Sequence, residues 1–506
     1  MPSASLPADA AGSDLSGGTM ASASAPADAT GSDLSGGTMA SASAPADAAG
    51  SDSVARTMPS ASAPAGAGDQ PAGVGAAQQS GRRDVAKRPR LPGGIRGAAG
   101  GVLFWGLLAG VFAAQLAIVA KSLPLLAPDS LHYYARALVY AGVDRAEAFA
   151  AANAAGAPWG WRIDTISQMF DWDLVAPRVV LPALAAPFAP WLGWRSLLVI
   201  SIPAAAAVFG LIAWAVRRRF GAIPALATAI LAIGCRDWFY FLVAGLTESL
   251  SALLFALALG AAWRYRLNRR AQAGRAQAGR AQAGRAQAGR APGWGAGVGW
   301  LAAAVAASGL FAFTRQAALI PAGALAVAFV GEWVRTRRFR NSWLAPAAAI
   351  VGTSAACQLY QALRYPFDQG QQLMEQTGQD TIGAALAHMP GRLLTVLKWA
   401  IGAFAQHDPV MLLAGGLGAL GLVLCWRRLE AHLALGAALG GLAYQAANGA
   451  LQTALRYCEP GLFAYALLVG AVLARIALRW RRHRDGAKGW PEGSDHVQGD
   501  GGALAD

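Results

Sequence analysis

The chain has 506 residues, of which 55% are hydrophobic and only 14% are charged, well below the roughly 25% charged residues of soluble domains. Uncharged apolar runs of about 20 residues recur, and this length crosses a hydrocarbon core about 30 Å thick. These values exclude an ordinary soluble protein and indicate an all-α, polytopic membrane protein.

The net charge of +14 does not point to a nucleic-acid partner. The basic residues lie in short clusters between apolar runs, at 217–219, 335–340, 427–428 and 479–484. Such clusters mark the cytoplasmic ends of membrane helices. The four cysteines are too few and too scattered for a disulfide scaffold or a zinc site. We expect them to be small buried hydrophobes, although Cys235 and Cys458 are both predicted near the outer face and could pair.

Residues 1–96 are predicted to be a disordered repeat region followed by a basic collar. The repeats have a period of 19 residues and are rich in Ala, Ser, Gly, Pro and Asp, with almost no large apolar side chains. Such a segment cannot bury enough surface to offset the entropy lost on ordering. The basic collar at 82–96 precedes an uncharged run at 101–120. We interpret that run as a signal anchor, with the N-terminus in the cytoplasm and residue 121 outside.

Residues 97–484 are predicted to form the membrane domain, with about ten transmembrane helices and both termini in the cytoplasm. The expected spans are 101–120, 196–216, 222–234, 244–263, 297–313, 317–334, 343–363, 410–426, 431–451 and 461–478. The first outer loop, 121–195, is expected to be helical. The RAQAG repeats fit neither a helical nor a strand period, so 264–296 is interpreted as a cytoplasmic linker loop. The polar tail at 485–506 is predicted to be disordered.

Five charged residues lie at the outer ends of predicted spans, where they are candidates for chemistry. They are Asp129, Asp237, Glu248, Arg315 and Arg456. A charge at membrane depth costs about 2.5–3.5 kcal/mol, so such residues are often functional. The alternative is that each pairs or snorkels at the interface. An anionic lipid phosphate needs arginine partners, for which Arg178, Arg315 and Arg456 are candidates. A hydroxyl acceptor needs a carboxylate base, for which Asp129 is the best placed.

Residues near these charges complete the candidate site. Asp129 and Tyr133 are four positions apart and would share one helical face, so His132 and Tyr133 could contact a sugar. A belt of interfacial aromatic residues is an equally good interpretation of the tyrosines. Tyr457 follows Arg456 directly and is a further candidate. Asp171 and Asp173 flank Trp172 and are weak candidates for holding a divalent cation.

The order of these features resembles the GT-C superfamily of membrane glycosyltransferases, particularly the dolichyl- or polyprenyl-phosphate-mannose mannosyltransferase branch. Four passages within 101–480 carry the resemblance. They are APDSLHYYARAL, the proline-bearing PRVVLPALAAPFAPWLGWRSLLVISIPAAAAVFGLIAWAVRRRFG, the pair LTESLSALLFALALGAAWRYR and GLFAFTRQAALIPAGALAVAF, and RYCEPGLFAYALLVGAVLA.

The resemblance implies an enzyme in a bacterial inner membrane that moves a mannose-like hexose or a pentose from a polyprenyl-phosphate donor. Asp129 would deprotonate a hydroxyl of a glycan, lipid or protein acceptor on the outer face. Arg315 or Arg456 would stabilise the departing polyprenyl phosphate, while Glu248 and Asp237 would orient the sugar or the base. The alternatives are a transporter or flippase of a lipid-linked or small substrate, and a membrane protein without catalysis.

Overall fold

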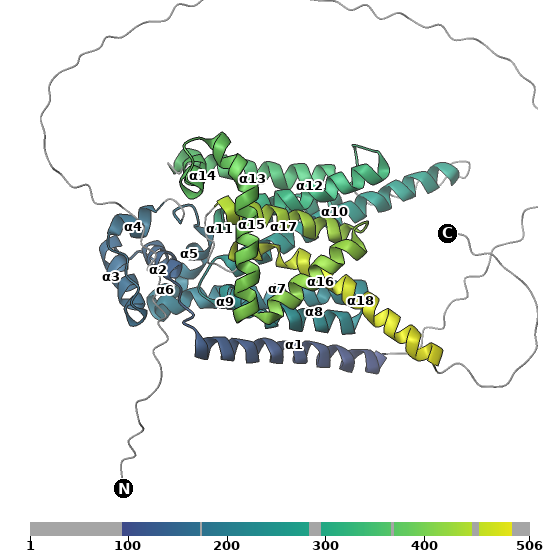
Figure 1. The fold of residues 1–506 in the computed structure, drawn as a ribbon, viewed down its shortest axis with the longest axis horizontal. Helices are drawn as coiled ribbons and strands as arrows, with labels where there is room; N and C mark the ends of the chain where they lie inside the picture. The colour runs from purple at the N-terminus through teal and green to yellow at the C-terminus, as the bar shows by residue number, and fades with distance from the viewer. Residues whose placement is uncertain (1–93, 173–174, 283–294, 366–368, 448–454, 488–506) are drawn as a thin grey trace, which may run out of the picture. The chain divides into compact units, whose positions relative to one another are not determined.

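The structure is a computed structural model that describes residues 94–172, 175–282, 295–365, 369–447 and 455–487. These residues belong to one compact unit, Arg88–Asp506, and Figure 1 shows their helices. The segments predicted to be disordered, 1–96 and 485–506, lie outside the described residues except at their inner ends, where α1 begins at Gly94 and α18 ends at Ala487.

The regular secondary structure of the described residues is all helix, with no strands, as predicted. Its α-helices are α1 (Gly94–Ser122), α2 (Pro128–Tyr140), α3 (Arg145–Gly156), α4 (Ile166–Asp171), α5 (Val180–Ala185), α6 (Ala189–Leu192), α7 (Ser196–Phe220), α8 (Ala222–Gly234), α9 (Arg236–Val243), α10 (Glu248–Gln282), α11 (Gly295–Thr314), α12 (Leu319–Thr336), α13 (Leu344–Arg364), α14 (Gln369–Thr377), α15 (Ile382–His407), α16 (Pro409–Cys425), α17 (Leu429–Ala447) and α18 (Leu462–Ala487). Its 3₁₀ helices are η1 (Ala157–Trp159), η2 (Ala186–Phe188), η3 (Gly193–Arg195) and η4 (Arg456–Gly461).

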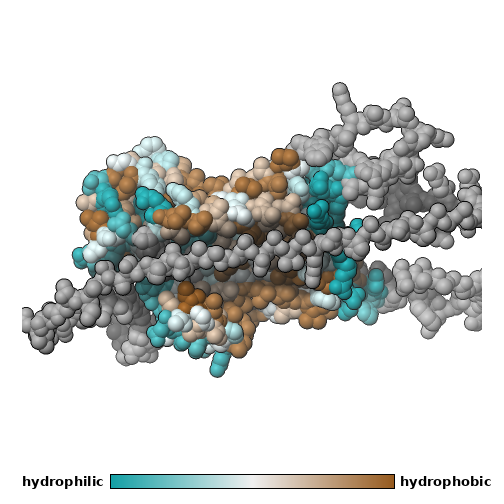
Figure 2. Space-filling view, turned by 90° about the horizontal axis from the view of Figure 1, so that it is seen from above, coloured by the Kyte–Doolittle hydropathy of each residue, from teal (hydrophilic) through white to brown (hydrophobic). Residues whose placement is uncertain are grey.

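Six helical segments among the described residues are long and apolar enough to cross a membrane, or seven if the bent pair α8–α9 counts as one span. They are Gly100–Ser122, Val180–Phe220, Glu248–Gln272, Gly297–Thr314, Leu319–Thr336 and Arg456–Trp480. Figure 2 shows apolar residues over the middle of the visible surface and hydrophilic residues gathered toward its two ends. These features support a helical, multi-pass membrane protein.

The predicted count of ten spans is not confirmed. The predicted spans that are missing from the candidate spans are short, bent or polar. Helix α8 has 13 residues and meets α9 at a bend of 78°. Helix α16 has only 17 residues. Helices α13 and α17 are longer but carry polar side chains within them, such as Gln361 and Glu430.

The predicted linker loop at 264–296 differs from the structure in its first part. Helix α10 runs without a break for 35 residues to Gln282, and Figure 1 shows its end projecting past its neighbours. Alanine, glutamine and arginine are good helix formers. The helix propensity of these residues therefore predicts this part of α10 better than the missing amphipathic period in the RAQAG repeats does. Residues 283–294 lie outside the described part.

The segment 121–195, predicted to be a helical outer loop, contains α2 to α6, which gather at one end of the bundle (Figure 1). The predicted loop ends at 195, whereas the candidate span Val180–Phe220 begins within it. Helix α2 starts with Pro128 in its first turn, where the missing N–H costs nothing. The Ser130 hydroxyl accepts from the N–H of Ala127 at 3.1 Å and caps this start. Arg136, on the same helix, donates to the carbonyl oxygens of Phe170, Val175 and Ala176, and so fixes these residues against α2.

Glycines bring α12 and α17 into backbone contact. A Cβ on Gly323 would lie 2.3 Å from the carbonyl oxygen of Gly436, and a Cβ on Gly440 would lie 2.0 Å from that of Leu319. Small residues allow such close packing between membrane helices. A Cβ on Gly441, also in α17, would lie 3.0 Å from Cys458 of η4. The close packing therefore brings η4 toward the start of α12, just after Arg315.

Candidate functional site: a buried ion-pair cluster

Two acids and two arginines from four separate segments of the chain meet in one cluster. Asp129 lies in the first turn of α2, and Glu248 is the first residue of α10. Arg315 directly follows α11, and Arg456 is the first residue of η4. We call these four residues the ion-pair cluster. All four were predicted site residues, and the structure brings them together.

The charges of the ion-pair cluster alternate in sign. Arg315 Nη1 lies 2.6 Å from Glu248 Oε1, and Arg456 Nε donates to the same oxygen. Arg456 Nη2 donates to Asp129 Oδ2 at 3.0 Å. The order of contact is therefore Asp129, Arg456, Glu248, Arg315, with Arg456 shared between two carboxylates.

The exposure of the side chains falls along the same order. The side chain of Asp129 is 28% exposed and that of Arg456 is 11% exposed, while those of Glu248 and Arg315 are fully buried. The cluster is therefore accessible from outside at Asp129 and Arg456. Arg315, predicted to bind a phosphate, is held by an internal acid at the buried end.

Aromatic rings surround the two arginines of the cluster. The Arg456 guanidinium carbon lies 5.2 Å from the centre of the Phe241 ring, and that of Arg315 lies 4.7 Å from the centre of the Tyr457 ring. Such cation–π contacts stabilise a positive charge away from water. The backbone N–H of Tyr457 donates to Gln445 at 3.2 Å. Tyr457 was a predicted contact residue, whereas the sequence offered no signal for Phe241.

Arg178 lies near the cluster and contacts Tyr133 of α2. Its Nη1 donates to the Tyr133 hydroxyl at 2.8 Å, and its side chain is buried with no partner for Nε. Asp129 and Tyr133 both lie in α2, as their spacing predicted. The positive charge of Arg178 also acts on Asp129. The third predicted phosphate-binding arginine is therefore near the exposed end of the cluster.

His132 is held by the protein itself through one ring nitrogen. Its Nδ1 lies 3.0 Å from the carbonyl oxygen of Met169, which can only accept, so Nδ1 carries the proton. The imidazole also lies 5.0 Å from the Trp172 ring, centre to centre. Burial lowers the pKa of His132, although the carbonyl of Met169 partly opposes this effect. The ring is neutral at pH 7.

Asp129 is ionised at neutral pH. Burial alone would raise the pKa of its carboxyl group, but the charges of Arg456 and then Arg178 outweigh burial and lower that pKa below its ordinary value of 3.8. The charge of Glu248 raises the pKa of Asp129, and His132 lowers it. In this conformation the Asp129 carboxylate is therefore available as an acceptor but is a weak base.

Arg315, within the cluster, and Glu459, near it, both have unused hydrogen-bonding capacity. Nε and Nη2 of Arg315 have no partner among the described residues, and neither do the two carboxyl oxygens of Glu459. Glu459 is fully buried in η4 and lies within electrostatic range of Glu248, Arg315 and Arg456. The sequence prediction missed Glu459, although it stands three residues after Arg456 in the same short motif.

Two predicted site residues, Asp237 and Asp171, interact with partners outside the ion-pair cluster. The backbone N–H of Asp237 donates to Asp408 at 3.2 Å, and the charges that act on its carboxylate come from Asp408, Arg236 and His407. Asp171 pairs with Arg145 at 3.0 Å on the surface. Asp173 lies outside the described residues. Among the described residues, no group of three or more histidine, cysteine or acidic side chains is arranged to hold a metal ion.

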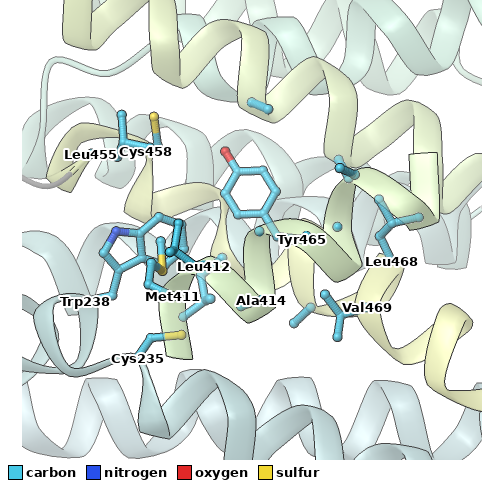
Figure 3. Close-up of a pocket in the computed structure, with 18 of the residues that line it drawn as sticks. Cys235, Trp238, Met411, Leu412, Ala414, Leu455, Cys458, Tyr465, Leu468 and Val469 are labelled. Atoms are coloured by element: carbon cyan, nitrogen blue, oxygen red, sulfur yellow. The ribbon is translucent and has the colours of Figure 1, made fainter. Parts of the chain in front are cut away.

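An apolar cavity of about 650 Å³ lies beside η4. Leu455 and Cys458, which flank Arg456 along the chain, are part of its wall. Figure 3 shows Trp238, Met411 and Tyr465 around the cavity. Leu455 adopts a left-handed backbone conformation with φ of 56°, which is uncommon for a residue other than glycine. The short η4 helix therefore contributes Arg456 to the charged cluster and Cys458 to an apolar cavity.

All four cysteines are free, and Cys235 and Cys458 both line this cavity. The structure thus contains no disulfide between them, and the expected role as buried hydrophobes fits Cys235, Cys425 and Cys458. Cys357 is only partly buried.

Comparisons of the chain with protein-family models, with curated proteins and with solved structures return no match.

Proposed function

We propose that the protein is a glycosyltransferase that moves a sugar from a polyprenyl-phosphate donor to an acceptor hydroxyl at the outer face of the membrane. The observation that carries this proposal is the contact between Arg456 and Asp129. It places a candidate phosphate-binding group beside a candidate base, at the exposed end of a cluster that is otherwise buried.

The proposed base is Asp129. Its carboxylate is the most exposed group of the cluster, so an acceptor hydroxyl can reach it. Asp129 takes the hydroxyl proton while the acceptor oxygen forms a bond to the anomeric carbon. The bond from that carbon to the phosphate oxygen breaks, and its electron pair leaves with the polyprenyl phosphate. The sugar is transferred with inversion.

The proposed phosphate-binding groups are Arg456 and Arg178. Both lie beside Asp129, and Arg178 has an unpartnered Nε. Guanidinium groups bind phosphate oxygens through short, charge-assisted hydrogen bonds. Negative charge accumulates on the phosphate as the bond to the sugar breaks, so positive groups fixed in advance favour the transition state. Arg315 does not contact the phosphate in this proposal; it binds Glu248, which in turn holds Arg456.

The apolar cavity offers room for the hydrocarbon of the same donor. Its wall includes Leu455 and Cys458, on either side of Arg456 in the chain. A polyprenyl phosphate is an amphiphile with a charged end and an apolar chain. We propose that its phosphate binds Arg456 and that part of its chain enters the cavity, where burial from water stabilises the complex.

The direct test uses purified protein in lipid nanodiscs with a panel of polyprenyl-phosphate sugars. Release of polyprenyl phosphate is followed by mass spectrometry, with and without sugar, lipid and peptide acceptors. Wild-type protein should release polyprenyl phosphate from one donor of the panel, and Asp129→Asn should not. Asp164→Asn is the matched control, because Asp164 is an exposed acid of the same outer segment.

Two results would contradict the proposal. Full activity in Asp129→Asn would remove Asp129 as the base. A transporter or flippase would move the lipid-linked sugar between leaflets without breaking the sugar–phosphate bond. Translocation with no release of polyprenyl phosphate from any donor would therefore favour that alternative.

A further inference from the structure

We infer that Glu248 is a positioning residue that holds Arg456 by Nε, so that Nη2 can pass from Asp129 to the donor phosphate. Binding of the phosphate would then free the Asp129 carboxylate to act as a base. This inference rests on the proposed function, because it concerns the same donor and the same site.

The two acids that share Arg456 differ in the way that this exchange requires. Glu248 is fully buried and also contacts Arg315, so its contact with Arg456 Nε is shielded from water and from ligands. Asp129 is 28% exposed and contacts Arg456 through Nη2. Breaking a buried ion pair is far more costly than breaking an exposed one. An entering anion therefore competes with Asp129 and leaves Glu248 in place.

The exchange changes Asp129 from a weak base to a stronger one. The charged and titratable groups that act on its carboxylate are Arg456, Arg178, Glu248 and His132. A phosphate that takes Arg456 Nη2 weakens the largest lowering influence on the pKa of Asp129 and adds a negative charge nearby. Both changes raise the pKa of Asp129. A carboxylate with a higher pKa accepts the hydroxyl proton more readily, so the base becomes effective only when the donor is bound.

Proton linkage provides the test. The probe is a short-chain prenyl methyl phosphodiester, because a diester lacks the phosphomonoester pKa near about 6. Its binding to the full-length protein in nanodiscs is measured by calorimetry just above pH 3.8, the ordinary pKa of aspartate, in buffers of different ionisation enthalpy. Wild-type protein should take up a substantial fraction of a proton, at most about one, for each probe bound. In Asp129→Asn the probe should bind at least as tightly, with no proton taken up.

A second arm isolates Glu248. In Glu248→Gln, Arg456 acts on Asp129 alone and the negative charge of Glu248 is lost, and both changes lower the pKa of Asp129. The acid limb of the pH profile of kcat/KM, where activity falls as Asp129 is protonated, should therefore move to lower pH. Glu248→Asp, which keeps the charge, should restore the wild-type limb. A merely structural Glu248 would reduce the amount of active enzyme equally at every pH and leave the limb where it is.

The possible failures are distinguishable. Equal proton uptake by wild type and Asp129→Asn would overturn the exchange while leaving the proposed function intact. An unmoved acid limb in folded Glu248→Gln would overturn the positioning role. If Glu248→Gln does not fold, the comparison of wild type with Asp129→Asn still tests the exchange. Failure of the phosphodiester to bind wild type at all would instead overturn the proposed function.

Discussion

Arg456 Nη2 lies 3.0 Å from the carboxylate of Asp129, although 327 positions separate the two residues in the sequence. The contact joins α2 to η4, where the candidate span Arg456–Trp480 begins. Because Arg456 also contacts the buried Glu248, a change at this single side chain affects both acids of the cluster.

Replacement of Arg456 by lysine should abolish most of the activity. A guanidinium can contact two carboxylates through separate nitrogen atoms, whereas an ammonium is a single point of charge on a flexible stem. We expect kcat to fall by about a hundredfold or more, the effect of losing one fixed donor to a transition-state anion. The measurement is release of polyprenyl phosphate in nanodiscs. Arg145→Lys is the matched control, because the Arg145–Asp171 pair is on the surface. An equal loss in both variants would contradict the prediction.

Removal of Glu248 should destabilise the protein through Arg315. Glu248→Gln leaves two buried arginines without their shared acid, and breaking such a pair costs about 3–5 kcal/mol. Arg315→Gln combined with Glu248→Gln removes one of the two buried charges that lost their partner. The double variant should therefore lose less free energy of unfolding than the sum of the losses in the two single variants. The midpoint of thermal unfolding in detergent is measured for the three variants, with size-exclusion chromatography as the readout of folded protein. Strict additivity would show that the two side chains do not interact.

The sequence predicted the fold class and the members of the ion-pair cluster better than it predicted their arrangement. Charges at the ends of apolar runs stand out, so Asp129, Glu248, Arg315 and Arg456 were all identified. Their order of contact and burial depends on packing between distant helices, such as the glycine contacts of α12 with α17, which no local pattern encodes. Asp237 had the same local signal but packs beside Asp408. Phe241 and Glu459 lacked a distinguishing signal because apolar and acidic residues at helix ends are common.

The glycine contacts that bring η4 toward the start of α12 should not tolerate a side chain. A Cβ on Gly440 would lie 2.0 Å from the carbonyl oxygen of Leu319, so Gly440→Ala must push α12 and α17 apart. Overpacking of this kind costs about 1–3 kcal/mol. Gly260→Ala in α10 is the control, because nothing lies within 4 Å of its added Cβ. We expect a lower midpoint of thermal unfolding for Gly440→Ala alone. A similar midpoint for both variants would contradict the close packing.

Activity should persist to acidic pH in the wild type and less far in Arg178→Met. The base must be ionised, and Arg456 and Arg178 together lower the pKa of Asp129 below 3.8 despite its burial. Activity that needs ionised Asp129 is therefore kept as pH falls, until pH passes through this lowered pKa. Removal of Arg178 raises that pKa, so the acid limb of kcat/KM should move to higher pH. The limb is measured with saturating acceptor. A limb that stays in place would show that Arg178 does not act on the base.

Filling the apolar cavity should discriminate between donors by the length of their hydrocarbon chain. Ala414 lines the cavity, so Ala414→Phe would occupy space that we assign to the polyprenyl chain (Figure 3). Each buried methylene is worth about 0.8 kcal/mol, so exclusion of even two or three should weaken a long-chain donor by about 10-fold or more. A donor too short to reach the cavity should be unaffected. Leu413→Phe is the control, because the neighbouring Leu413 is exposed on the same helix. If Ala414→Phe weakens both donors equally, the cavity does not hold the chain, and the phosphate contacts at Arg456 must account for donor binding without it.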